Sequence, residues 1–156
     1  MATLVSVLVL VISAFMLVFW LRSASRSVLR ERFEQNYSAE VAEANQLEFL
    51  TIRKALSDGA GDGVDYASSL SALERDFEAL TYLLRNAATV NVGRYTRRER
   101  LLVLDFQLLR VWVRMKRVLG FSSWQAGLVE MATILEYFGN VVGQRLVTFP
   151  SRVPVS

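Results

Sequence analysis

The sequence predicts an all-α protein with a single N-terminal transmembrane helix that continues into a stalk, followed by a three- to four-helix antiparallel bundle. Three observations predict this fold class. An uncharged apolar run opens the chain, later apolar residues recur at helical rather than strand spacing, and the 156 residues include only 2 prolines. The expected parts are an anchor (1–21), a helical stalk (22–57), a Gly/Asp linker (58–65), a bundle domain (66–147) and an extended tail (148–156).

The anchor is the first element. Between positions 4 and 19, twelve residues are Leu, Val, Ile or Phe, and each gains about 0.3 to 0.6 kcal/mol on insertion into a bilayer. A helix of about 20 residues is about 30 Å long, which matches the thickness of the hydrocarbon layer. Trp20 ends the run, where interfacial aromatic side chains belong. The run therefore predicts a membrane span.

Two other interpretations of the apolar run are a buried core helix and a cleaved signal peptide. Core helices of soluble domains are seldom uncharged over such a length. A signal peptide carries basic residues before an apolar segment of about 7–15 residues, whereas here the run is longer and the arginines only follow it. The small residues at 23–25 are the feature that fits cleavage. We expect a permanent anchor.

The charges beside the anchor predict its orientation. Arg22, Arg26 and Arg30 follow the run at intervals of four residues, so they share one helix face and can contact anionic lipid headgroups. Basic flanks stay on the cytoplasmic side of a membrane. We therefore expect the N-terminus outside the cell membrane and the C-terminal domain in the cytoplasm.

The stalk and the linker come next. No proline or glycine occurs between positions 23 and 56, and the stretch is rich in good helix formers, with a break near 36–38 as an alternative. Three glycines at 59–63 then end the helix. The linker lacks the Gly-Lys-Ser/Thr ending of a phosphate-binding loop, and Ser69 stands where a calcium loop needs glutamate. We expect a connector.

The first two bundle helices carry clear local signals. The helix at 66–90 has a heptad pattern of apolar residues, which is typical of a bundle or coiled coil. Its members are Tyr66, Leu70, Leu73, Phe77, Leu80, Leu84 and Ala87. The next helix begins at a Thr96-x-x-Glu99 capping box and ends near Leu119, before Gly120. Short turns between such helices predict antiparallel neighbours.

The last helix, which ends near Val147, is apolar enough to suggest a second span. Glu130 and Glu136 make insertion of this helix into a bilayer costly, so we expect a core helix. Glu136, Asn140 and Gln144 recur every four residues and predict a solvated face. This helix therefore has one face in the core and one in water.

Charged residues are segregated along the chain. Residues 31–78 hold eleven acidic and four basic residues, whereas residues 94–117 hold eight basic and two acidic ones. Four arginines form a stripe along the second bundle helix: Arg100, Arg110, Arg114 and Arg117. We expect this stripe either to pair with acidic helices of the same chain or to contact headgroups or a protein partner. The net charge of +3 is too small to favour nucleic acid.

Asp105 lies on the opposite side of the same helix, among apolar residues. A carboxylate in such a place needs a partner or takes up a proton. We expect a buried ion pair between Asp105 and Arg85 that fixes the register of the helices.

The composition limits the chemistry. The chain contains no histidine and no cysteine, which removes the commonest general base, the thiolate nucleophile and the usual ligands of zinc. We expect no catalytic site, no cofactor and no metal. The leading hypothesis is a non-catalytic single-pass membrane protein, in contact with membrane lipid, whose cytoplasmic domain binds another protein or forms a homo-oligomer.

Two further functions remain open from the sequence. One is a membrane-tethered regulatory or ligand-sensing module with a pocket lined by Asp105, Trp112 and Tyr137. The other is an enzyme that uses only Asp, Glu, Arg and Tyr.

Overall fold

The computed structural model describes residues 2–31, 33–58, 63–86, 95–121 and 123–148. Within these ranges the secondary structure is helical and contains no strand, so the all-α class is confirmed. The helices are α1 (Ala2–Leu29), α2 (Ser38–Ala44), α3 (Phe49–Ser57), α4 (Tyr66–Asn86), α5 (Arg97–Val118) and α6 (Trp124–Thr148). Most of the predicted linker, and the predicted tail beyond residue 148, lie outside the described residues.

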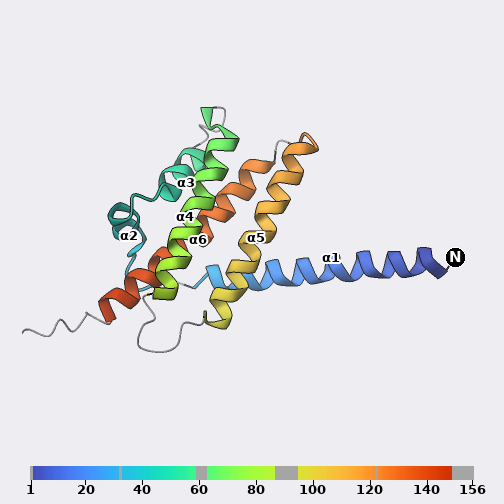
Figure 1. The fold of residues 1–156 in the computed structure, drawn as a ribbon, viewed down its shortest axis with the longest axis horizontal. Helices are drawn as coiled ribbons and strands as arrows, with labels where there is room; N and C mark the ends of the chain where they lie inside the picture. Colours follow the sequence, from blue (N-terminus) through green and yellow to red (C-terminus); the bar gives the residue numbers. More distant parts are fainter. Residues whose placement is uncertain (1, 32, 59–62, 87–94, 122, 149–156) are drawn as a thin grey trace, which may run out of the picture.

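Helix α6 is the centre of the bundle. Helices α2, α3, α4 and α5 all pack against it (Figure 1). The side chains of Leu128, Met131 and Phe138 on α6 are completely buried. Phe77 of α4 stacks on Phe106 of α5 beside them, with ring centroids 4.0 Å apart. The expectation that this apolar, glutamate-containing helix belongs to the core is therefore confirmed.

Local sequence signals set the ends of the bundle helices. The Thr96 hydroxyl accepts from the Glu99 N–H and the Glu99 carboxylate accepts from the Thr96 N–H, which completes the capping box of α5. Gly120 follows α5 with φ of +75°, a conformation that glycine adopts without strain. Asp65 accepts from the Ser68 N–H at 2.8 Å and caps α4.

The predicted uninterrupted stalk is wrong, whereas the alternative of a break near 36–38 agrees with the start of α2 at Ser38. Helix α1 ends at Leu29, and α2 lies against α6 instead of continuing α1. The Asn140 side chain of α6 accepts from the backbone N–H groups of Tyr37 at 2.7 Å and Ser38 at 3.0 Å, just at the start of α2. Close approach is possible because Gly143 faces this segment: a Cβ on it would lie 2.2 Å from the Tyr37 Cβ.

Helix α3 is also held by side chains distant in sequence. Asp76 of α4 accepts from the N–H groups of Glu48 at 2.7 Å and Phe49 at 2.8 Å, where α3 begins. Arg53 of α3 forms an ion pair with Glu136 of α6. The predicted solvated face of α6 is therefore covered at two of its three positions. The segment expected to be a stalk supplies two helices of the bundle.

Helix α1 has two parts with different surroundings. Its residues from position 4 to position 20 are exposed, whereas its last two turns pack against α5 and α6. Among the described helices, α1 is the one long and apolar enough to cross a membrane. Figure 1 shows its N-terminal length projecting away from the bundle, past α5.

Candidate functional site

The junction of α1 with the bundle gathers charged side chains. Arg22 and Arg26 of α1 both form ion pairs with Glu130 of α6, the second with 3.1 Å between Arg26 Nη2 and Glu130 Oε1. Arg30, one turn further along, is exposed. Trp20 precedes the cluster and is 63% exposed. Two of the three arginines predicted to contact headgroups therefore also bind the domain itself.

Asp105 of α5 lies beside the same arginines and is only 3% exposed. Burial raises the pKa of Asp105, while the positive charges of Arg22 and Arg26 act in the opposite direction. Asp105 Oδ1 and Ser25 Oγ are buried without a hydrogen-bond partner in the described part of the chain. Within this part of the chain, Oδ1 of the ionised carboxyl therefore lacks a hydrogen-bond donor that would offset the cost of its burial.

The structure does not bring Asp105 and Arg85 together. The Arg85 Nε donates to the Tyr95 hydroxyl at 2.9 Å, and the guanidinium lies over the Tyr95 ring, 5.3 Å from its centroid. The cations whose charges act on Asp105 are instead Arg22 and Arg26 of α1, and both of these form their ion pairs with Glu130. The predicted ion pair between Asp105 and Arg85 is therefore wrong, because Arg85 contacts Tyr95 instead.

The arginine stripe of α5 makes contacts within the chain. Arg114 donates to Glu74 of α4 at 2.6 Å, and the Arg110 Nε lies 3.9 Å from the same carboxylate. The Arg117 guanidinium lies over the ring of the first residue of α4, 5.5 Å from its centroid. Arg100 is exposed. Of the roles left open for this stripe, the structure shows contact with an acidic helix of the same chain.

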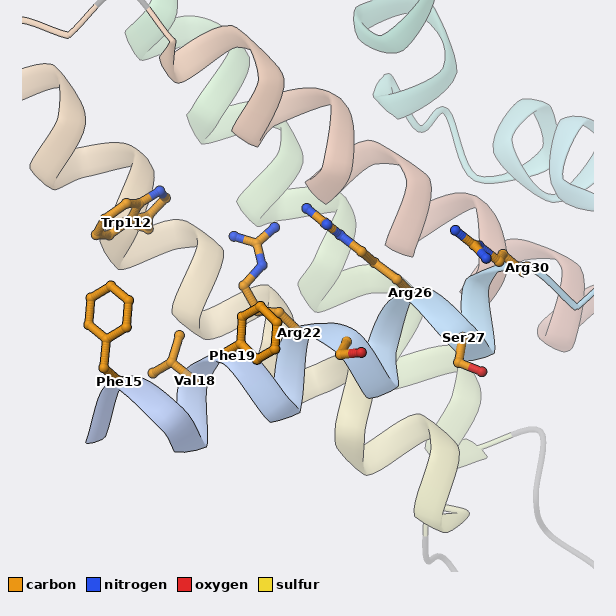
Figure 2. Close-up of a pocket in the computed structure, with 9 residues that line it drawn as sticks. Phe15, Val18, Phe19, Arg22, Arg26, Ser27, Arg30 and Trp112 are labelled. Atoms are coloured by element: carbon orange, nitrogen blue, oxygen red, sulfur yellow. The ribbon is translucent and has the colours of Figure 1, made fainter. Parts of the chain in front are cut away.

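A cavity of about 590 Å³ lies in the corner between α1 and α5 (Figure 2). It joins the apolar part of the candidate span to the basic flank. Its lining consists of Phe15, Val18, Phe19, Arg22, Ser23, Arg26 and Ser27 of α1, of Arg30 directly after this helix, and of Trp112 of α5. A cavity with aromatic walls at one end and guanidinium groups at the other suits an amphipathic molecule with an anionic head.

In the part of the chain that the structure describes, the three residues expected to share one pocket line three different cavities. Trp112 lines the corner cavity, Asp105 lines a second cavity of about 250 Å³, and Tyr137 lines a third beside Phe33. The described residues contain no group of three or more His, Cys, Asp or Glu that could hold a metal ion.

Sequence reasoning missed Ser25 and Glu130 as parts of the junction. A signal for Glu130 was present, because a glutamate in an otherwise apolar helix needs a cationic partner. Ser25 carried no such signal, since a serine at the end of a membrane helix fits solvent as well as protein.

Comparisons with known proteins add nothing to this geometry. No family model, no curated protein and no solved structure matches the chain at a significant level. The function is therefore argued from the junction and the surfaces of the bundle.

Proposed function

We propose that the chain is a non-catalytic single-pass membrane protein whose helical domain is held in a fixed orientation in the cytoplasm beside the cell membrane. There the domain binds another protein or a second copy of the chain. The observation that carries this proposal is the junction. Helix α1 passes without a linker from exposed apolar residues into two turns packed on the bundle, where Ser25 is completely buried.

The exposed part of α1 supports the anchor. Its large apolar side chains are 39% to 72% exposed, from Val18 at the low end to Leu4, Phe15 and Phe19 at the high end. Soluble monomers rarely leave a continuous apolar surface of this extent in water. Insertion of the twelve Leu, Val, Ile and Phe residues into lipid favours the bound state by about 5 kcal/mol.

The packed junction supports a bundle whose orientation relative to α1 is fixed, rather than a bundle that rotates freely on a tether. The ion pairs of Arg22 and Arg26 with Glu130 join α1 to the central helix of the bundle. Because α1 cannot turn independently of α6, one side of the bundle faces the bilayer and the other faces away from it. The basic flank supports a cytoplasmic location for this bundle.

The side of the bundle remote from the free length of α1 supports binding of a basic partner. Figure 1 shows α2 and α3 on that side. Glu34, Glu40 and Glu43 are exposed there and form no ion pair in the part of the chain that the structure describes. A partner with complementary basic residues would be attracted to this acidic surface.

Cross-linking in native membranes tests the proposal. A photo-reactive residue in place of Ala44, which is exposed on α2, is expected to give an adduct of defined mass with the full chain. The double variant Glu40→Lys with Glu43→Lys should lose the adduct, whereas the control Glu78→Lys on α4 should keep it. Absence of any adduct, together with a monomeric mass in gentle detergent, would contradict the proposed interaction.

A further inference from the structure

We infer that the C-terminal half of α5 is a lipid-docking surface that lies in the interface of the same bilayer that α1 crosses. This inference rests on the proposed function in one respect, the membrane span of α1. The docking face consists of exposed apolar residues in this half of α5, together with one residue two turns earlier and two that follow the helix: Val111, Trp112, Met115 and Val118, with Leu104, Leu119 and Phe121.

The exposure of this face is unusual for a bundle helix. At 100° per residue, Leu104, Val111, Met115 and Val118 fall within an arc of about 60°. The buried side of α5 lies opposite and consists of Leu102, Phe106, Leu109 and Val113. Helices of soluble bundles have a polar face opposite the core, whereas the C-terminal half of α5 is apolar on both of these faces. The outer face therefore requires an apolar or amphipathic surrounding, and Val118 alone is 86% exposed.

The corner cavity fixes the depth of the docking face. Trp112 lines this cavity together with Phe15 and Val18, so these side chains lie at a similar level along α1. Phe15 is seven residues from Arg22 on the membrane side, which corresponds to about 10 Å along a helix. The ring of Trp112 therefore lies beside residues that the proposed span places in lipid.

The side chains around Trp112 suit a membrane interface. The Lys116 Nζ lies 5.5 Å from the centroid of the Trp112 ring. The same ammonium group donates to the Ser123 carbonyl oxygen at 3.5 Å. A lysine beside a tryptophan is typical of helices at the headgroup level. Figure 1 shows α5 as the bundle helix next to the free length of α1.

Lipid is the partner we assign to the docking face, because this face adjoins the part of α1 that the proposal places in the bilayer. The corner cavity is lined by both helices, so a lipid molecule beside Phe15 also meets Trp112. A protein partner would first have to displace lipid from this corner. Docking on lipid buries the outer face of α5 without a further protein and adds a second contact that fixes the orientation of the bundle.

Fluorescence quenching by brominated lipids tests this inference on the full chain in liposomes. The chain has 3 tryptophans, and replacing two of them by phenylalanine leaves Trp20, Trp112 or Trp124 as the single emitter. We expect lipids brominated near the headgroup end of the acyl chain to quench Trp112 about as strongly as Trp20. Trp124 is the matched control, because its ring packs against Tyr66 with centroids 5.3 Å apart, and it should be quenched several-fold less.

A second variant separates docking from a change in fold. Val111→Glu combined with Val118→Glu places charges on exposed positions, so the bundle should keep its unfolding temperature in detergent while quenching of Trp112 falls at least two-fold. Strong quenching of Trp20 with little quenching of Trp112 would overturn the docking face and leave the anchor in place. Little quenching of both would overturn the anchor as well. A disulfide dimer of Val118→Cys with unquenched Trp112 would assign the face to a second copy and overturn the inference.

Discussion

Replacing Asp76 by alanine tests how the bundle holds α3. Asp76 is completely buried, and its Oδ2 accepts both N–H groups that begin this helix, from Glu48 and Phe49. Removal of the carboxyl leaves two donors without an acceptor, and each unsatisfied buried donor costs about 1–3 kcal/mol. Water can reach the half-buried Glu48 N–H, so we expect Asp76→Ala to lower the free energy of unfolding by about 2–4 kcal/mol.

Asp76→Asn is the matched control, because one carbonyl oxygen can accept both hydrogen bonds. Burial raises the pKa of Asp76, although the two backbone N–H groups and Arg75 act in the opposite direction. A raised pKa means that the folded state holds the proton more tightly than the unfolded state. The native chain therefore loses stability as the pH rises from the usual value of 3.8 through the raised folded value. Over that interval the Asn variant should become more stable relative to the native chain.

Unfolding of the full chain in detergent micelles, followed by circular dichroism in urea, measures these differences. Hydrogen exchange in residues 49–57 adds a local measurement. We expect faster exchange there in Asp76→Ala and native-like exchange in Asp76→Asn. If the two variants unfold within about 0.5 kcal/mol of each other at neutral pH, a difference no larger than that of ordinary surface substitutions, the capping role of Asp76 is refuted.

Three further predictions concern the junction and the packing of α6. Glu130→Gln removes the partner of Arg22 and should lower the free energy of unfolding by about 1–2 kcal/mol, with faster hydrogen exchange at the end of α1; unchanged exchange would contradict the packed junction. Gly143→Ala should lower the free energy of unfolding by about 1–3 kcal/mol, because the added Cβ would lie 2.2 Å from the Tyr37 Cβ. Gly63→Ala, whose added Cβ would have no atom within 4 Å, should lower the free energy of unfolding in urea far less. Asp105→Asn should gain stability relative to the native chain as the pH rises above 3.8, because burial raises the pKa of Asp105; a gain that shrinks with rising pH would show that the arginines outweigh burial.

The all-helical class and the helix ends could be predicted because their causes are local. The Thr96–Glu99 capping box and Gly120 after α5 each act within a few residues of the helix end that they set. The heptad pattern of α4 is confirmed for its members up to Leu84 for the same reason, while Ala87 lies outside the described residues. Apolar residues at that spacing share one face whichever helix covers them.

The folded-back segment could not be predicted because its causes are distant in sequence. Asn140 and Asp76 cap α2 and α3 from other helices, and neither pairing leaves a local pattern. The polar residues that recur every four positions on α6 therefore predict a solvated face, whereas Glu136 and Asn140 in fact contact α3 and the start of α2. A helix propensity without interruption favoured one long stalk, but tertiary contacts override such propensities.

The candidate site was predictable only in part. The helical wheel placed Asp105 among apolar residues, and the apolar run identified α1. The contact between Asp105 and the end of α1 could not be predicted, because a sequence that suits lipid carries no signal that its last two turns pack against a protein. The exposed apolar arc of α5 was hidden for a related reason: apolar residues at helical spacing do not indicate which of two faces lies in the core.

We propose above that α1 crosses the cell membrane and keeps the bundle on the cytoplasmic side. The chain has no cysteine of its own, so Thr3→Cys and Glu78→Cys each provide a single thiol at an exposed position. A maleimide that cannot cross membranes should label Thr3→Cys in intact cells, and should label Glu78→Cys only after permeabilisation. Labelling of Glu78→Cys in intact cells, or its recovery in the aqueous fraction without residue 3, would contradict the account.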